Sequence, residues 1–241
     1  LVENDRVIGG MTPLCSEKAI ELYKTFVQGE CVTTNARTAE MVKLTENSCR
    51  DVQIAFANEL SIICDKLDIN VWELILLANR HPRIKILQPG PGVGGHCIAV
   101  DPWFIASKTP EEAQLIHTAR NVNDSKPEWV IKKIKLAIAE FLLENSDKTV
   151  KEVNVGIYGL AFKPNIGDLR ESPALYIASK FASIHTGRTM AVEPNVTQLP
   201  TGIENLSLVS LSEAMEYSDI HVMLVDHQEF MVVDWTTVNK D

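Results

Sequence analysis

The sequence predicts an α/β protein in which a helical domain built on one long helix precedes a smaller parallel α/β domain. Two observations carry this prediction. The chain has no glycine between Gly29 and Gly90, and apolar residues recur at helical spacing from Thr38 to Lys66. After Asn145, short β-branched apolar runs alternate with helical patterns, which is typical of a parallel sheet with helical crossovers.

The helix predicted over 38–66 would be about 43 Å long at a rise of about 1.5 Å per residue. It is much longer than an average globular helix, and such helices usually form a spine or an oligomer interface. A second helix is predicted over 70–81, because Asn70 can cap it while Glu73 completes a capping box.

A third helix is predicted to begin at Ser125, where Ser-Lys-Pro-Glu forms a capping box with Pro127 in the first turn, and to reach Glu144. The polar stretch 146–150 follows, and we place a domain boundary there. The other predicted elements are shorter. Strands are expected at 6–8, 31–34, 153–158, 189–193 and 220–225, and helices at 16–27, 172–185 and 211–217.

Composition and charge exclude several classes of function. The 241-residue chain carries a formal net charge of -9, which repels nucleic acid and anionic membranes, so we expect neither as a partner. No apolar run reaches the roughly 18 residues of a membrane-spanning helix. The five cysteines form no C-x-x-C pair, which argues against a disulfide framework or a zinc site. We therefore expect no metal and a reducing cytoplasm.

The stretch GPGVGGHC, from Gly90 to Cys97, matches the G-x-G-x-x-G pattern of dinucleotide-binding loops. That interpretation requires a preceding strand, which 83–87 could form, and a following helix, which two β-branched residues and Pro102 argue against. We interpret the match as accidental. Glycines also let the backbone fold tightly and turn amides towards a sulfur, which favours a nucleophilic thiolate. The alternative is a buried structural cysteine.

Three segments together resemble the UDP-glucose/GDP-mannose dehydrogenase superfamily, and the resemblance covers essentially the whole chain. Its most similar branch is the bacterial one that oxidises UDP-N-acetyl-D-mannosamine. The segments are TAEMVKLTENSCRDVQIAFANEL (38–60), GPGVGGHCIAVDPWF (90–104) and GLAFKPNIGDLRESPA (159–174).

The resemblance implies a four-electron oxidation of C6 of a UDP-sugar to a carboxylate, with NAD as cofactor, in a cytoplasmic homodimer formed through central helices. It divides the chain into a remnant of an N-terminal NAD-binding domain (1–36), a central helical dimerisation domain with the cysteine loop (37–147) and a truncated, Rossmann-like UDP-sugar-binding domain (148–241). The chain lacks an initiator Met, so we expect a fragment of a longer protein. Because the resemblance implies that nearly all of the NAD-binding domain is absent from it, we expect this fragment to be inactive alone.

The resemblance assigns four catalytic residues. Cys97 matches the nucleophile, which forms a thiohemiacetal with the aldehyde intermediate and then a thioester. Lys43 and Asn47 match residues that flank the reacting oxygen, and their i, i+4 spacing places both on one helix face. Asp101 matches the acid that orients the hydrolytic water. Without the resemblance, Lys43 would be interpreted as a solvated surface lysine and Asp101 as a turn residue.

The remaining assignments concern binding. Arg170 matches the arginine that reaches the cofactor pyrophosphate; its alternative is a surface ion pair with Asp168 or Glu171. Arg83 matches an arginine that enters the partner subunit's substrate site. For the two asparagines of RNVND, a helix-boundary role is an equal alternative. The residues implied to bind substrate are Lys163, Arg83, Asn121, Asn123, Gly94 and Gly95.

Some positions depart from the family pattern. Gly167 stands where an acid is common, which leaves the local charge around Arg170 open. Ala99 and Val100 replace a proline and a lysine of the UDP-glucose branch, which argues against UDP-glucose as substrate. Two alternatives stay open: a non-catalytic module that binds nucleotide sugars and dimerises, and a dehydrogenase for another UDP-N-acetylhexosamine or UDP-glucose.

Overall fold

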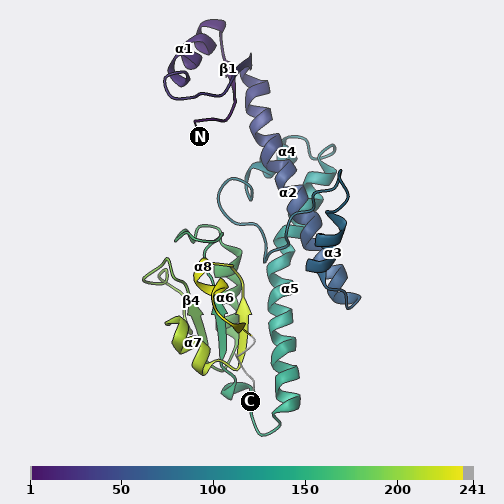
Figure 1. The fold of residues 1–241 in the computed structure, drawn as a ribbon, viewed down its shortest axis with the longest axis vertical. Helices are drawn as coiled ribbons and strands as arrows, with labels where there is room; N and C mark the ends of the chain where they lie inside the picture. The colour runs from purple at the N-terminus through teal and green to yellow at the C-terminus, as the bar shows by residue number, and fades with distance from the viewer. Residues whose placement is uncertain (1, 236–241) are drawn as a thin grey trace.

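The computed structural model describes residues 2–235, so Leu1 and residues 236–241 of the expected C-terminal domain lie outside it. The molecule is elongated, with a small N-terminal unit at one end and an α/β domain beside the lower half of a long helix (Figure 1). The N-terminal unit is a strand pair with one helix, as the sequence predicted, although the helix begins at Pro13 and ends at Tyr23 instead of spanning 16–27. It comprises β1 (Arg6–Gly10), α1 (Pro13–Tyr23) and β2 (Cys31–Asn35).

The central part contains four helices: α2 (Ala36–Lys66), α3 (Val71–Ala78), α4 (Asp101–Lys108) and α5 (Gln114–Glu144). The predicted long helix is confirmed as α2, which begins where the Asn35 side chain accepts the N–H of Thr38. Helix α5 runs beside the second half of α2 in the same direction. Arg120, near the start of α5, pairs with Asp51 in the middle of α2, and Lys133, further along α5, pairs with Asp65 at the end of α2. Among residues 2–235, no helix is both long and apolar enough to span a membrane.

The predicted helix start at Ser125 is wrong. Helix α5 begins eleven residues earlier, at Gln114, and Pro127 lies inside it. The Ser125 hydroxyl donates to the Val122 carbonyl instead of capping a helix end. The turn upstream of the proline is held by Arg120, whose buried guanidinium pairs with α2, and this packing outweighs the local capping signal.

Two further local predictions are also corrected. Residues 83–87 form no strand, because the backbone of Ile86 bonds to the side chain of Asn79 instead of to another strand. A helix does follow the cysteine loop, since α4 begins at Asp101 with Pro102 in its first turn, where a missing N–H costs no hydrogen bond. The second predicted helix is confirmed in part, because α3 ends at Ala78, before the expected residue 81.

The C-terminal domain is a parallel sheet in the order β5-β4-β3-β6. Its predicted strands and helices are confirmed, while β5, α8 and a 3₁₀ turn (η1) were not predicted. The elements are η1 (Val150–Glu152), β3 (Val155–Tyr158), α6 (Pro173–Ile184), β4 (Thr189–Val192), β5 (Leu206–Leu208), α7 (Leu211–Tyr217), β6 (Ile220–Met223) and α8 (Gln228–Met231).

One hydrophobic core joins α5 to this domain. Ile134 of α5, Phe181 of α6 and Ile157 of β3 are buried in the same cluster. The chain moves outward from β3 to β4 and β5 and then returns to β6 on the other side of β3. Strand order therefore reverses beside β3, and ligands of such sheets bind at the carboxyl ends of the strands at that point.

Candidate active site

Three of the four predicted catalytic residues, Lys43, Asn47 and Asp101, lie on helices α2 and α4, which the fold brings together, and Cys97 lies in the loop just before α4. The Asn47 amide of α2 donates to the Asp101 carboxylate at the start of α4, with Nδ2 and Oδ2 2.5 Å apart. The Lys43 ammonium donates to Asn47 Oδ1 over 3.2 Å. The Cys97 carbonyl accepts the Asp101 N–H at 2.8 Å, and the Cys97 side chain is exposed. A thiol, an ammonium, an amide and a carboxylate thus share one region.

The glycines of the cysteine loop serve close contact with the C-terminal domain. A Cβ at Gly94 would lie 2.6 Å from the Glu171 carbonyl oxygen and 2.7 Å from the Phe162 Cβ atom, so no side chain fits there. Gly95 adopts a φ of 77°, a conformation that favours glycine. Without side chains at these positions, the loop backbone lies directly against the turn that precedes α6.

Contrary to the expectation, two backbone amides of the loop do not point towards the Cys97 sulfur but bond to other segments. The Gly95 N–H donates to the Arg170 carbonyl at 3.3 Å, and the Gly90 N–H donates to Asn58 Oδ1 at 2.8 Å. These two amides therefore attach the loop to its neighbours and are not available to Cys97. The reason is tertiary, because both acceptors belong to segments far away in the sequence.

Residues 160–172 form a turn, here called the lysine turn, that carries Lys163, Asp168 and Arg170. The Lys163 side chain is exposed, with Nζ 5.6 Å from the centre of the Phe162 ring. The Arg170 guanidinium makes a two-point contact with the Asp168 carboxylate, with Nη2 and Oδ2 2.6 Å apart. These hydrogen bonds lower the pKa of Asp168 to about 2. Arg170 is 67% exposed, so its remaining donors face solvent.

The glycine at 167 has a steric explanation. A Cβ at Gly167 would lie 2.4 Å from the carbonyl oxygen of Asn195, so a larger residue would displace one of the two backbones. Glycine replaces the expected acidic residue at this position because the lysine turn packs closely against the segment after β4.

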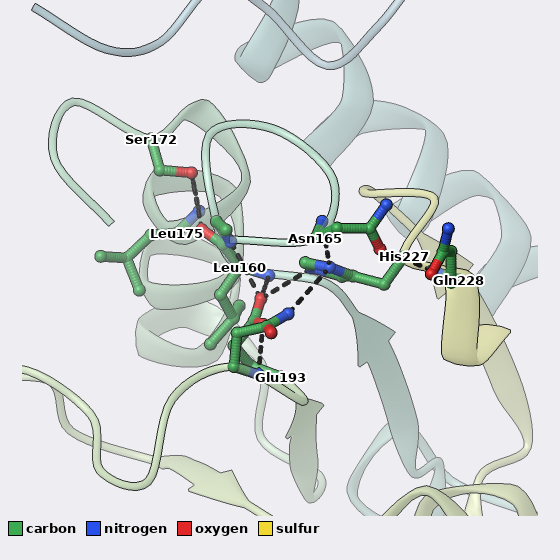
Figure 2. A network of polar contacts seen from close by, with 9 residues as sticks. Leu160, Asn165, Ser172, Leu175, Glu193, His227 and Gln228 are labelled. Carbon is green, nitrogen blue, oxygen red and sulfur yellow. Dashed lines mark hydrogen bonds and ion pairs between the residues drawn. The ribbon is translucent and has the colours of Figure 1, made fainter. Parts of the chain in front are cut away.

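A buried carboxylate and imidazole organise the lysine turn from below (Figure 2). Glu193 Oε2 accepts the N–H groups of Leu160 and Ala161 at 2.8 and 3.0 Å, and it lies 3.0 Å from His227 Nε2. His227 Nδ1 accepts the N–H of Asn165 at 3.0 Å, which assigns the proton to Nε2 and makes that nitrogen the donor to Glu193. Both side chains are fully buried.

The sequence predicted no role for Glu193 or His227. A usable signal existed, because each follows the carboxyl end of a strand of the parallel sheet, Glu193 directly after β4 and His227 shortly after β6, where functional side chains gather. Ser172 closes the other end of the turn: its hydroxyl donates to the Leu160 carbonyl at 2.6 Å and accepts the Leu175 N–H at 3.3 Å. The lysine turn is therefore held at both ends by buried side chains.

The other predicted binding residues lie on α5 and on the segment before the cysteine loop, and Asn123 of α5 lines a cavity together with Val93 of that loop and Leu169 of the lysine turn. Asn121 is exposed, and its amide contacts His117 Nδ1 at 3.2 Å. Asn123 is 1% exposed within α5 and bonds Asp51. Arg83 is exposed on the segment that leads to the cysteine loop. Within residues 2–235, no group of three or more His, Cys, Asp or Glu side chains is arranged to hold a metal ion.

Comparison with known proteins matches two parts of the chain to models of one family. Residues 37–125 match the central domain of the UDP-glucose/GDP-mannose dehydrogenase family, and residues 156–241 match its UDP binding domain. Together the two models cover more than half of the chain.

The relatives match along the whole chain. The UDP-N-acetyl-D-mannosamine dehydrogenase of Escherichia coli K12 is 61% identical over 241 residues, which are 100% of this chain and 57% of that protein. A solved UDP-D-ManNAc dehydrogenase from Pyrococcus horikoshii is 37% identical with a TM-score of 0.82, and a UDP-N-acetyl-mannosamine dehydrogenase from Staphylococcus aureus is 43% identical with a TM-score of 0.81. Each match covers 99% of this chain and 54% of the solved chain. The chain thus spans little more than half the length of these proteins.

Proposed function

Because the chain belongs to the UDP-glucose/GDP-mannose dehydrogenase family, we propose that the complete protein oxidises C6 of UDP-N-acetyl-D-mannosamine to a carboxylate in two NAD-dependent steps. The observation that carries this proposal is the exposed Cys97 beside the hydrogen-bonded series Lys43, Asn47 and Asp101. The 61% identity with a UDP-N-acetyl-D-mannosamine dehydrogenase supports this sugar.

The chemistry follows from the side chains of this chain. The first oxidation converts the alcohol to an aldehyde, and the Cys97 thiolate then adds to the aldehyde carbon, forming a C–S bond and a thiohemiacetal. Loss of a second hydride from C6 leaves a thioester. Bound NAD⁺ supplies the hydride acceptor in both oxidations. Water attacks the thioester carbon, Asp101 takes the proton of that water, and the C–S bond breaks to return the thiolate.

Lys43 and Asn47 stabilise the negative oxygen that develops when sulfur or water adds to the carbonyl. An asparagine amide has two N–H donors, and Asn47 uses one of them on Asp101. Its second N–H and the Lys43 ammonium remain for the oxyanion. The same hydrogen bond fixes the Asp101 carboxylate beside the reacting centre, so positioning of the water and stabilisation of the oxyanion depend on one side chain.

Binding of the two ligands involves the loop and the lysine turn. Lys163, Gly94 and Gly95 contact the UDP-sugar, together with Asn121 and Asn123, and Arg83 reaches the substrate site of a second subunit. Arg170 fits the NAD pyrophosphate, because its guanidinium is exposed and its orientation is set by Asp168. Most of the NAD-binding surface belongs to a domain of which residues 1–36 are a small part.

The complete protein forms a cytoplasmic homodimer through its central helices. Large apolar side chains are exposed on α2 and α3, including Phe56 (51%), Trp72 (56%) and Leu76 (70%). Exposed apolar surface of this kind on neighbouring helices favours burial against a second subunit. Analytical ultracentrifugation at micromolar concentration tests the dimer, and a monomer alone would contradict it.

The decisive test uses the complete gene product and a panel of UDP-sugars, with NADH formation and uronate as readouts. UDP-N-acetyl-D-mannosamine is expected to give the highest kcat/KM.

Cys97→Ser is expected to lower uronate formation at least about a thousandfold, because the thioester cannot form. Cys49→Ser, which changes an exposed cysteine of α2, is the matched control and should retain activity. Wild-type turnover by Cys97→Ser would refute the mechanism, and NADH formation by residues 1–241 alone would refute the need for the missing domain.

A further inference from the structure

Two asparagine side chains hold the segment that leads into the cysteine loop, residues 84–90, here called the lead-in. Asn79, which ends α3, bonds both backbone groups of Ile86: its Nδ2 donates to the carbonyl at 2.9 Å and its Oδ1 accepts the N–H at 2.7 Å. Four residues later, the Gly90 N–H donates to Asn58 Oδ1 of α2 at 2.8 Å. Within the described part of the chain, the lead-in pairs with no strand. The two asparagine side chains therefore make the hydrogen bonds to its backbone N–H and C=O groups that a neighbouring strand would make in a sheet.

The position of Asn58 is itself fixed by a buried polar network between α2 and α5. Asn58 Nδ2 donates to Asn123 Oδ1 at 2.9 Å, and Asn123 Nδ2 donates to Asp51 Oδ1 at 2.8 Å. Asp51 also accepts from the Arg120 guanidinium at 2.7 Å. All four residues are at most 2% exposed, and hydrogen bonds in such low-dielectric surroundings are strengthened. The amide of Asn58 therefore cannot rotate without leaving a buried donor or acceptor unpaired.

The cysteine loop is consequently attached at three points. Asn58 holds its entry at Gly90, the Arg170 carbonyl holds Gly95, and the N–H of Asp101 holds the carbonyl of Cys97. We propose that Asn58 is a positioning residue for the Cys97 sulfur, with Asn79 as a second support, so that the helix interface sets where the thiol lies. The catalytic consequence rests on the proposed function, whereas the attachment of the loop is a property of this chain alone.

The test compares Asn58→Leu with the wild-type 241-residue chain by hydrogen exchange. Gly90 stands between Pro89 and Pro91, which have no N–H, so its amide can be followed without exchange from either neighbour. Loss of the Asn58 acceptor is expected to speed exchange at Gly90 at least about tenfold.

Thiol alkylation distinguishes a local change at Cys97 from a general loss of structure, because other cysteines of the chain report on the rest of the fold. Cys97 and Cys15 are exposed and Cys64 of α2 is buried. In Asn58→Leu, the alkylation rate of Cys97 should rise at least about threefold, because the loop opens more often, while Cys15 is unchanged and Cys64 stays protected. Wild-type rates at both Gly90 and Cys97 would overturn the proposal. A parallel rise at Cys64 and Cys97 would also overturn it, since the helices would then have separated.

Two further variants keep the test interpretable. Asn79→Ala removes the second support at a half-buried position and should speed exchange at Ile86 and alkylation of Cys97 even if Asn58→Leu does not fold. Lys126→Met is the matched control, because Lys126 is buried in the same helix interface, bonds Ser61 and contacts no loop residue through any hydrogen bond in the described chain. It should leave Gly90 exchange and Cys97 alkylation at wild-type values, and a change in both would argue against a specific role of Asn58.

In the complete enzyme, Asn58→Leu is expected to lower kcat at least about tenfold while KM changes less than about threefold, because a misplaced nucleophile affects chemistry more than binding. An unchanged kcat together with faster Gly90 exchange would overturn positioning of the sulfur. Retained activity in Cys97→Ser would refute the proposed mechanism. If the exchange and alkylation results were nevertheless as expected, they would still support the attachment of the loop by Asn58.

Discussion

The most quantitative prediction concerns Lys126, a lysine buried between α2 and α5. Its residue surface is 3% exposed, its ammonium donates to Ser61 Oγ at 2.5 Å, and it lies 3.7 Å from the centre of the Trp129 ring. Burial lowers the pKa of Lys126 from 10.5 to about 8, and the nearby Asp65 charge acts in the opposite direction. The folded protein therefore binds this proton more weakly than the unfolded chain does.

The sign of the pH dependence follows from that difference. Because the folded pKa is the lower one, unfolding takes up a proton between about pH 8 and 10.5, and stability rises with pH through that window. Below the window, the charged lysine costs the folded state about 3 kcal/mol, an order-of-magnitude figure from a shift of this size. Between about pH 7 and 9.5, about 2 kcal/mol of that cost should be relieved.

The perturbation is Lys126→Met, which keeps most of the side-chain length and removes the charge. Urea denaturation of the 241-residue chain across this pH range should show a rising free energy of unfolding for the wild type and a flatter profile for the variant. At the upper end of this range tyrosines, with an ordinary pKa of 10.0, are only beginning to ionise. Tyr158, whose pKa burial raises to about 12 in the folded chain, opposes the effect of Lys126 mainly above this range, and it does so equally in the wild type and the variant. Identical pH profiles for the two proteins would refute the assignment of a costly buried charge at Lys126.

Three other predictions test the lysine turn. Gly167→Ala places a Cβ 2.4 Å from the Asn195 carbonyl oxygen, so it should displace the turn and weaken UDP binding at least about tenfold in calorimetry of the complete protein; unchanged affinity would contradict the steric argument. Glu193→Gln exchanges a buried hydrogen-bonded carboxylate for an amide and should lower the unfolding free energy by about 1.5–3 kcal/mol in chemical denaturation, whereas full wild-type stability would show that the carboxylate is dispensable. Arg170→Ala should raise the pKa of Asp168 from about 2 towards its ordinary value of 3.8, measured by NMR titration of the carboxyl, and a pKa that stayed near 2 would assign the shift to another group.

Local patterns predicted the elements whose causes are local. The long helix over 38–66 was found because glycine and proline are absent and apolar residues recur with the helical period, and α2 confirms it. The same reasoning failed at Ser125, where a good capping pattern lies inside α5. There the side chain of Arg120 pairs with Asp51 of α2, and no pattern of neighbouring residues predicts that contact.

The sequence by itself determined the fold class, the family and the order of most of the elements. Helical periodicity, strand composition and the three motifs can each be identified from residues that are close together in the chain. The tertiary structure decided which residues meet. Asn47 and Asp101 are 54 positions apart, and Glu193 lies 33 positions from the backbone N–H of Leu160 that it holds. Such contacts depend on how helices and strands pack, and packing joins side chains whose separation along the chain carries no signal of their distance in space.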